Sequence, residues 1–121
     1  MNTPSHLELA ERDDGSAVVL AATGIMDMGV APDLADRVRA ILRRRPSMLI
    51  VDLTGVTFLA TAGMSVLMEA RRKSAELSIV FRVVAQSPVT VKPMQLLGID
   101  DLLAIYPTVG TALRESSAPD A

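Results

Sequence analysis

The chain has 121 residues, of which 50% are hydrophobic and 2% aromatic, and its formal net charge is −2. This length fits one domain, and the negative charge argues against a nucleic-acid binder held by phosphate neutralisation. With no cysteine and His6 as the only histidine, the chain has no means to form a disulfide framework, a thiolate metal site, a thiol nucleophile or a triad built on several histidines.

Membrane and export signals are also missing from the sequence. No apolar run approaches the roughly 18 residues of a membrane helix, and residues 1–6 lack the basic and apolar regions of a signal peptide. We therefore expect a cytoplasmic protein with no membrane insertion. We expect residues 1–121 to form a single domain, with residues 1–6 and 115–121 as flexible ends.

The first third of the chain predicts a hairpin and a helix. Residues 7–11 alternate between apolar and polar side chains, residues 17–23 form an apolar run, and a turn signal at 13–16 separates them. Apolar residues then recur at three- and four-residue steps over 32–44, which predicts an amphipathic helix. Its last residues overlap the arginine run 43–45, which complements the helix dipole and is otherwise expected to be a solvated charge cluster.

The middle of the chain alternates between strands and helices. Residues 48–53 are apolar with little alternation, which is typical of a central strand buried on both faces. A helix is predicted over about 61–75 and a strand over 77–85. Strands separated by helices favour parallel pairing, so we predict an α/β domain with a mixed, mostly parallel sheet.

A third helix starts at Ser87 and Pro88, which provide a capping hydroxyl and a proline suited to the first helical position. Because Pro93 removes one helical hydrogen bond, we expect this helix to be short, kinked or to start near Val91. Gly98 predicts a Schellman-like end. The residues expected to face inward are Val91, Met94 and Leu97, with Val89 as a further candidate.

The last elements are a brief strand over 102–105 and a final helix after Thr108, with Val109, Ala112 and Leu113 facing inward. The predicted order is thus ββαβαβαβα.

Motifs for enzymatic chemistry are missing from the sequence. It contains no G-x-G-x-x-G, no P-loop and no G-x-S-x-G elbow, and its carboxylates are scattered over predicted helix surfaces and turns. We therefore expect no catalytic residues, no metal site, no cofactor and no enzymatic activity. Two loops remain as candidates for binding, over residues 24–29 and 58–64, because neighbouring loops at the carboxyl ends of parallel strands form the usual binding edge.

Three elements of the sequence resemble the STAS domain family, and specifically its anti-sigma factor antagonists. Residues 24–27 match the G-x-[LI]-D element at the end of the second strand, residues 49–64 match the third strand and its turn, and residues 91–102 match a later leucine-rich element. The resemblance covers about residues 7–113. It implies the STAS fold, with helices packed mainly on one face of the sheet.

The resemblance also implies a function. Family members bind an anti-sigma factor, often a Ser/Thr kinase, and thereby release a sigma factor; the kinase reverses this by phosphorylating a hydroxyl in a D-S-[ST]-G turn. That hydroxyl corresponds to Thr61, whereas Ala60 and Ala62 stand where the family has an acid and a second hydroxyl, and Gly63 is retained. The expected partner-binding residues are Asp27, Met28, Gly29, Ala60, Thr61, Ala62, Gly63 and Met64.

Several alternatives remain open at this point. Thr61 is a phosphorylation site, a helix cap or both; Asp27 caps the first helix or reaches the partner; Gly63 permits close approach of a partner or only relieves local crowding. The chain is alternatively an accessory subunit of a lipid ABC transport system, or a STAS regulator that is not phosphorylated. We expect at most a weak homodimer.

Overall fold

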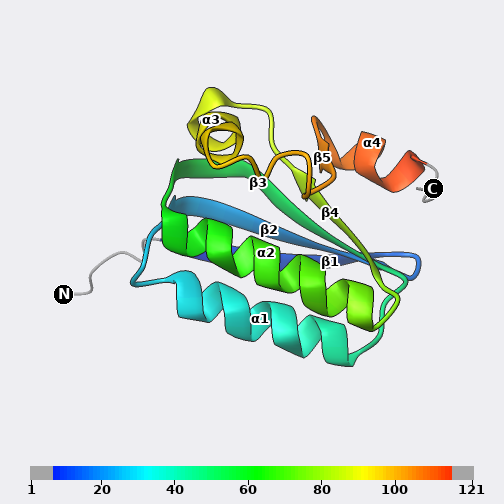
Figure 1. Ribbon diagram of the computed structural model, residues 1–121. Coiled ribbons are helices and arrows are strands. Elements are labelled where there is room, and N and C mark those ends of the chain that lie inside the picture. The colour runs from blue at the N-terminus through cyan, green and yellow to red at the C-terminus, as the bar shows by residue number, and fades with distance from the viewer. Residues whose placement is uncertain (1–6, 116–121) are drawn as a thin grey trace.

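The computed structural model describes residues 7–115 (Figure 1). The predicted order ββαβαβαβα is confirmed. The elements are β1 (Leu7–Asp14), β2 (Ala17–Met26), α1 (Ala31–Arg43), β3 (Met48–Leu59), α2 (Thr61–Glu76), β4 (Val80–Val84), α3 (Pro88–Leu96), β5 (Ile105–Tyr106) and α4 (Val109–Arg114). The predicted flexible ends lie outside the described residues, apart from Glu115.

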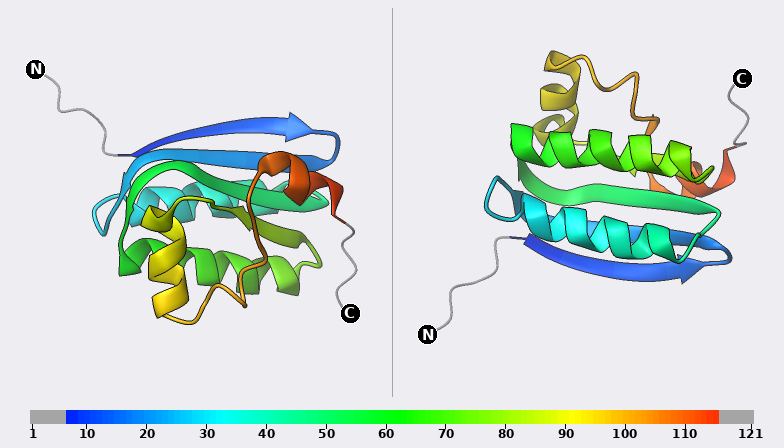
Figure 2. Two further views of the ribbon diagram at one scale, coloured as in Figure 1. Left: turned by 90° about the horizontal axis from the view of Figure 1, so that it is seen from above. Right: turned by 60° about the horizontal axis from the view of Figure 1, so that its bottom comes forward.

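The five strands form one mixed sheet in the order β1-β2-β3-β4-β5. β1 pairs with β2 in the antiparallel direction, and all other pairs are parallel. α1 and α2 lie side by side on one face of this sheet (Figures 1 and 2). The prediction of a mixed, mostly parallel sheet is therefore confirmed.

Two hydrophobic clusters hold these layers together. The main core lies between the sheet and the α1–α2 layer, where side chains such as Leu20, Leu34 and Leu67 are fully buried; α3 adds Met94 to it. A smaller cluster on the opposite face packs Ala112 of α4 against strand residues. Most helical packing is thus on one face, as expected, and α4 closes part of the other.

β3 is twice as long as predicted, because two irregularities let its pairing with β2 continue past Leu53. Ala21 lies opposite Asp52, but Thr23 lies opposite Gly55, so β3 holds one extra residue between these pairs; a second shift follows one residue later. Such bulges bend a strand without ending it. A Cβ atom at Gly55 would lie 2.8 Å from the Thr23 hydroxyl oxygen, which explains the glycine.

Longer strands also correct the limits of the two predicted loops. β2 runs to Met26, so residues 24–26 are strand and only residues 27–30 connect it to α1. β3 runs to Leu59 and α2 starts at Thr61, so Ala60 alone separates them.

α3 is a single short helix that contains Pro93. The Ser87 side chain accepts the Val89 N–H at 3.2 Å, which confirms the predicted cap. Thr90 and Met94 are its buried residues, so the prediction that Val89 and Leu97 face inward is wrong. These buried residues stand four apart and define one helical face, from which Val89 is about 100° away. Leu97 is the C-cap residue, where the helix has ended.

The Schellman ending of α3 is confirmed. Gly98 has φ +72°, its N–H donates to the Gln95 carbonyl at 3.0 Å, and the Ile99 N–H donates to the Met94 carbonyl at 3.0 Å. The left-handed conformation at Gly98 is one that glycine adopts at little cost.

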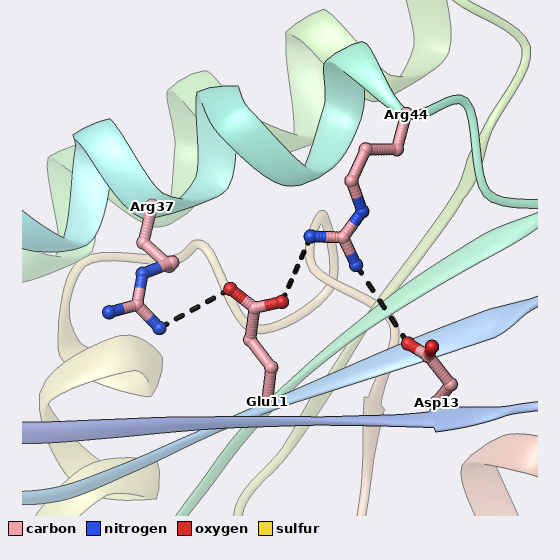
Figure 3. A network of polar contacts seen from close by, with 4 residues as sticks. All are labelled: Glu11, Asp13, Arg37 and Arg44. Atoms are coloured by element: carbon pink, nitrogen blue, oxygen red, sulfur yellow. Dashed lines mark hydrogen bonds and ion pairs between the residues drawn. The ribbon is translucent and has the colours of Figure 1, made fainter.

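Charged side chains join the edge strand β1 to α1 (Figure 3). Glu11 accepts from Arg37 at 3.3 Å and from Arg44 at 3.0 Å, and Arg44 also lies 3.8 Å from Asp13. Because these pairs are half-exposed, each contributes at most about 1 kcal/mol. Their main effect is to fix how α1 lies over the edge of the sheet.

Arg82 on β4 is buried and anchors α4. Its guanidinium donates to the Ala112 carbonyl at 2.6 Å and to the Glu115 carbonyl at 3.0 Å. It also lies 5.1 Å from the centre of the Tyr106 ring. These carbonyls belong to the end of α4, where helical partners run out.

We predict that Arg82→Met detaches α4 more than it unfolds the domain. Losing charge-assisted hydrogen bonds should lower the free energy of unfolding by about 1–3 kcal/mol, and amide exchange in α4 should accelerate at least tenfold. Hydrogen exchange followed by mass spectrometry measures this, with Arg12→Met at an exposed position of β1 as the control. Unchanged exchange in α4 would contradict the anchoring role.

Candidate functional site

The turn between β3 and α2 is held against the end of β2. The Ala60 N–H donates to the Met26 carbonyl at 3.0 Å, and Met26 lies opposite Leu59 in the sheet. Ala60 is extended, with φ −87° and ψ 166°, and is the N-cap residue of α2. The first residue of α2, Thr61, is therefore fixed in place by main-chain bonds.

Gly63 allows α2 to pack closely on this strand end. A Cβ atom there would lie 2.7 Å from both Cγ and Sδ of Met26 and 3.1 Å from Cδ1 of Leu59. Such distances are shorter than any ordinary van der Waals contact. Of the two roles considered for Gly63, the structure supports the local one, because the residue is buried and faces the core.

Thr61 is exposed at the first position of α2 and does not cap the helix. Within residues 7–115, its hydroxyl has no hydrogen-bond partner. The first bond along the helix runs from the Met64 N–H to the Ala60 carbonyl at 3.2 Å. The three preceding N–H groups, those of Thr61, Ala62 and Gly63, have no acceptor among the described residues, so the positive end of the helix dipole lies beside the Thr61 hydroxyl.

The predicted capping role falls at position 60 instead of 61. Ala60 is the cap residue and has no side-chain acceptor. An acid at this position, as in the family pattern, would accept one of the free N–H groups. This chain therefore keeps the hydroxyl of the turn but lacks its side-chain cap.

Asp27 organises the loop before α1. Its Oδ1 accepts the Gly29 N–H at 2.9 Å and the Val30 N–H at 3.3 Å. The N-cap of α1 is Val30, which has no side-chain cap bond. Asp27 thus forms an Asx turn three residues before the cap. Of the two roles considered for it, capping of α1 itself is not observed, and contact with the partner stays a prediction.

The predicted site residues gather at one end of the domain, where the β2–α1 loop and the start of α2 lie (Figures 1 and 2). Met28 is 78% exposed, and Gly29 and Thr61 are also exposed, while Asp27, Ala60 and Ala62 are half-buried. Gly63 and Met64 are buried. These two residues pack beneath the turn. That they contact a partner remains a prediction, and their burial does not support it.

Further apolar side chains are exposed that sequence reasoning did not assign to this site. Phe58 at the end of β3 is 52% exposed, and Leu96 and Leu97 at the end of α3 are 84% and 52% exposed. A hollow of about 480 Å³ between α2 and α3 has Thr61 and Leu97 among its lining residues. The only signal in the sequence was the position of the Leu96–Leu97 pair directly before Gly98, where α3 ends and neither side chain is covered by a further turn of the helix.

The hollow between α2 and α3 also has a charged margin. Arg72 pairs with Glu69 and Glu76 one turn away on each side. The hydrogen bond from Arg72 lowers the pKa of the Glu69 carboxyl and raises the pKa of Arg72. Glu69 and Arg72 line this hollow together with apolar side chains such as Met68.

Two kinds of site receive no support from the described part of the chain. No group of three or more histidine, cysteine, aspartate or glutamate residues within 7–115 is placed to hold a metal ion. In the same range, each helix is too short or too polar to cross a membrane.

Comparisons with known proteins agree with this geometry. The family model described as "STAS domain" matches residues 8–112. The anti-sigma-F factor antagonist RsfB of Mycobacterium tuberculosis is 29% identical over 113 residues, which cover 93% of this chain and 92% of that protein.

Solved structures show the same relationship. An anti-sigma factor antagonist from Mycobacterium paratuberculosis superposes with a TM-score of 0.85 at 31% identity, covering 93% of this chain and 96% of that one. The unphosphorylated form of the antagonist SpoIIAA superposes with a TM-score of 0.74, covering 88% of this chain and 93% of its own; at 14% identity it supports the fold alone. From the family match over residues 8–112 and these relatives, the chain belongs to the STAS domain family.

Proposed function

We propose that this protein is an anti-sigma factor antagonist that binds its anti-sigma factor through the surface around Thr61. The observation that carries the proposal is the exposure of Thr61 together with apolar side chains, Met28 and Phe58 among them, from the neighbouring ends of β2 and β3. Exposed apolar groups around a rigid turn are typical of a protein-binding surface. The names of the relatives support an antagonist over the subunit of a lipid transporter.

Phosphorylation of Thr61 by a kinase-type anti-sigma factor is the switch in this proposal. The Thr61 hydroxyl oxygen attacks the γ-phosphorus of ATP, a P–O bond forms, ADP leaves, and the hydroxyl proton is released. The free N–H groups at the start of α2 can accept the new negative charge, so the fold tolerates it. A docked apolar partner surface does not, because a phosphate of −1.5 to about −2 charges would have to be buried there.

Phosphorylation of Thr61 needs ATP, and the released sigma factor acts in transcription, so the proposal places the protein in the cytoplasm. Ala60 and Ala62 keep the hydroxyl uncrowded but offer the kinase no acid beside it. We therefore expect the kinase to recognise the shape of the turn more than its charge.

We predict that Thr61→Glu weakens binding of the anti-sigma factor at least tenfold, which is about 1.4 kcal/mol. Thr61→Gln has nearly the same size without the charge and should retain most of the affinity. Isothermal titration with each purified anti-sigma factor encoded in the same genome measures both variants. Equal affinities for Thr61→Glu and the unaltered protein would place the interface elsewhere.

A second prediction concerns the modification itself. Incubation with ATP and the partner kinase should add a single phosphate, and tandem mass spectrometry should find it on Thr61. Thr61→Ala should take up none. Phosphate on that variant, or none on the unaltered protein, would remove the switch and leave the binding proposal standing.

The third prediction tests the missing cap. Ala60→Asp should stabilise the fold by about 0.5–2 kcal/mol, because its carboxylate would accept a free N–H of the first turn. Ala62→Asp, placed inside that turn, benefits only from the helix dipole and should gain less, about 0.3–1 kcal/mol. Urea denaturation compares them. Equal gains for both variants would show that position 60 does not act as the cap.

A further inference from the structure

A cluster of cations lies at the other end of α1 and α2, away from Thr61. Four cationic side chains and two leucines line a hollow of about 320 Å³. Asp36, which does not line it, pairs with Arg39, so Arg43, Arg45 and Lys73 are the lining cations without a salt bridge among residues 7–115. The lining residues are Arg39, Leu42, Arg43, Arg45, Lys73 and Leu77. This concentration of positive charge stands out in a chain whose net charge is −2.

The three consecutive arginines at the end of α1 have different surroundings. Arg44 pairs with Glu11 and Asp13 of β1 (Figure 3). Arg43 and Arg45 instead border the hollow, together with Lys73 from α2. Of these three arginines, only Arg44 pairs with the acids of the edge strand. The packing of α2 against α1 adds Lys73 to the hollow that the other two arginines line.

An apolar channel continues from this cationic end along the seam between α1 and α2. A second hollow of about 180 Å³ shares Arg39, Leu42 and Lys73 with the first. Val38, Val66 and Ala70 are among its lining residues. Glu69 also borders it, but its carboxylate is bound by Arg72. We call the two connected hollows the α1–α2 groove.

We propose that the α1–α2 groove binds an acidic amphipathic segment of a partner protein. Charge complementarity decides the occupant: apolar side chains would lie on the seam, and carboxylates would meet the cations at its end. From Ala35 to Arg43, the last residue of α1, the groove follows about 12 Å of helix, at 1.5 Å per residue. This length suits about two helical turns or about four extended residues of a peptide. A single phosphate would use the cations but leave the apolar seam empty.

The cationic end of this groove lies away from the surface assigned to the anti-sigma factor. Thr61 and Lys73 are twelve positions apart on α2, which corresponds to about 18 Å. The apolar end of the groove reaches Ser65, about one helical turn from Thr61, and Ser65 and Glu69 also line the hollow beside Thr61. Thr61 itself does not line the groove, so a segment anchored at the cationic end leaves the Thr61 hydroxyl accessible. The protein could hold two partners at once, one of them regulated by phosphorylation and the other not.

The test uses a fluorescein-labelled peptide, Leu-Ala-Ala-Leu-Ala-Gly-Glu-Glu-Asp-Glu, titrated with the full chain and followed by fluorescence anisotropy. We expect saturable one-to-one binding that weakens as salt is raised. The double variant Arg43→Glu with Lys73→Glu should lose at least tenfold in affinity, and Arg12→Glu on β1 should lose none. Thr61→Glu should bind the peptide normally, which separates this site from the anti-sigma surface.

Peptide controls test both halves of the groove. Replacing the acidic residues by glutamine, or the leucines by serine, should each weaken binding at least tenfold. Circular dichroism melts of the variants establish that they are folded before binding is compared. Lack of saturable binding, equal binding of the serine peptide, or full displacement by phosphatidylglycerol vesicles or inorganic phosphate would overturn the proposal.

Discussion

The contact between the end of β2 and the start of α2 determines the position of the surface proposed to bind the anti-sigma factor. Met26 is fully buried, accepts the Ala60 N–H through its carbonyl and fills the space that a side chain at Gly63 would need. Because a main-chain hydrogen bond and a buried side chain form this junction, the backbone at Thr61 is held in a fixed position. A loop held only by surface contacts would spend part of any binding free energy on becoming ordered.

Much of the fold follows from local patterns in the sequence. The hairpin, the central strand after Met48 and the ends of α3 were all predictable, since turn residues, apolar runs and a glycine at position 98 act over a few neighbouring residues. The length of β3 was not, because Thr54 and Gly55 have the composition of a turn. Only pairing with Thr23 and its neighbours on β2 makes them a bulge within a continuing strand.

The candidate site, like the fold, could be predicted from the sequence only in part. The hydroxyl of Thr61 and its turn can be located from the sequence, but the N-cap falls one residue earlier, and Asp27 acts through an Asx turn before Val30. Helix boundaries depend on backbone angles that a short sequence window does not determine. The α1–α2 groove could not be predicted from local sequence patterns, because only the packing of α1 against α2 brings Lys73 to the arginines at the end of α1.

The length of α2 limits how far the electrostatic effect of a phosphate on Thr61 can reach. Its 16 residues extend for about 24 Å, at 1.5 Å per residue. In physiological salt the Debye length is about 8 Å, so a phosphate on the first residue is almost fully screened from side chains around the last turn. The helix therefore acts as a spacer as well as a core element. Charge can change at one end of the domain while the potential at the other end stays the same.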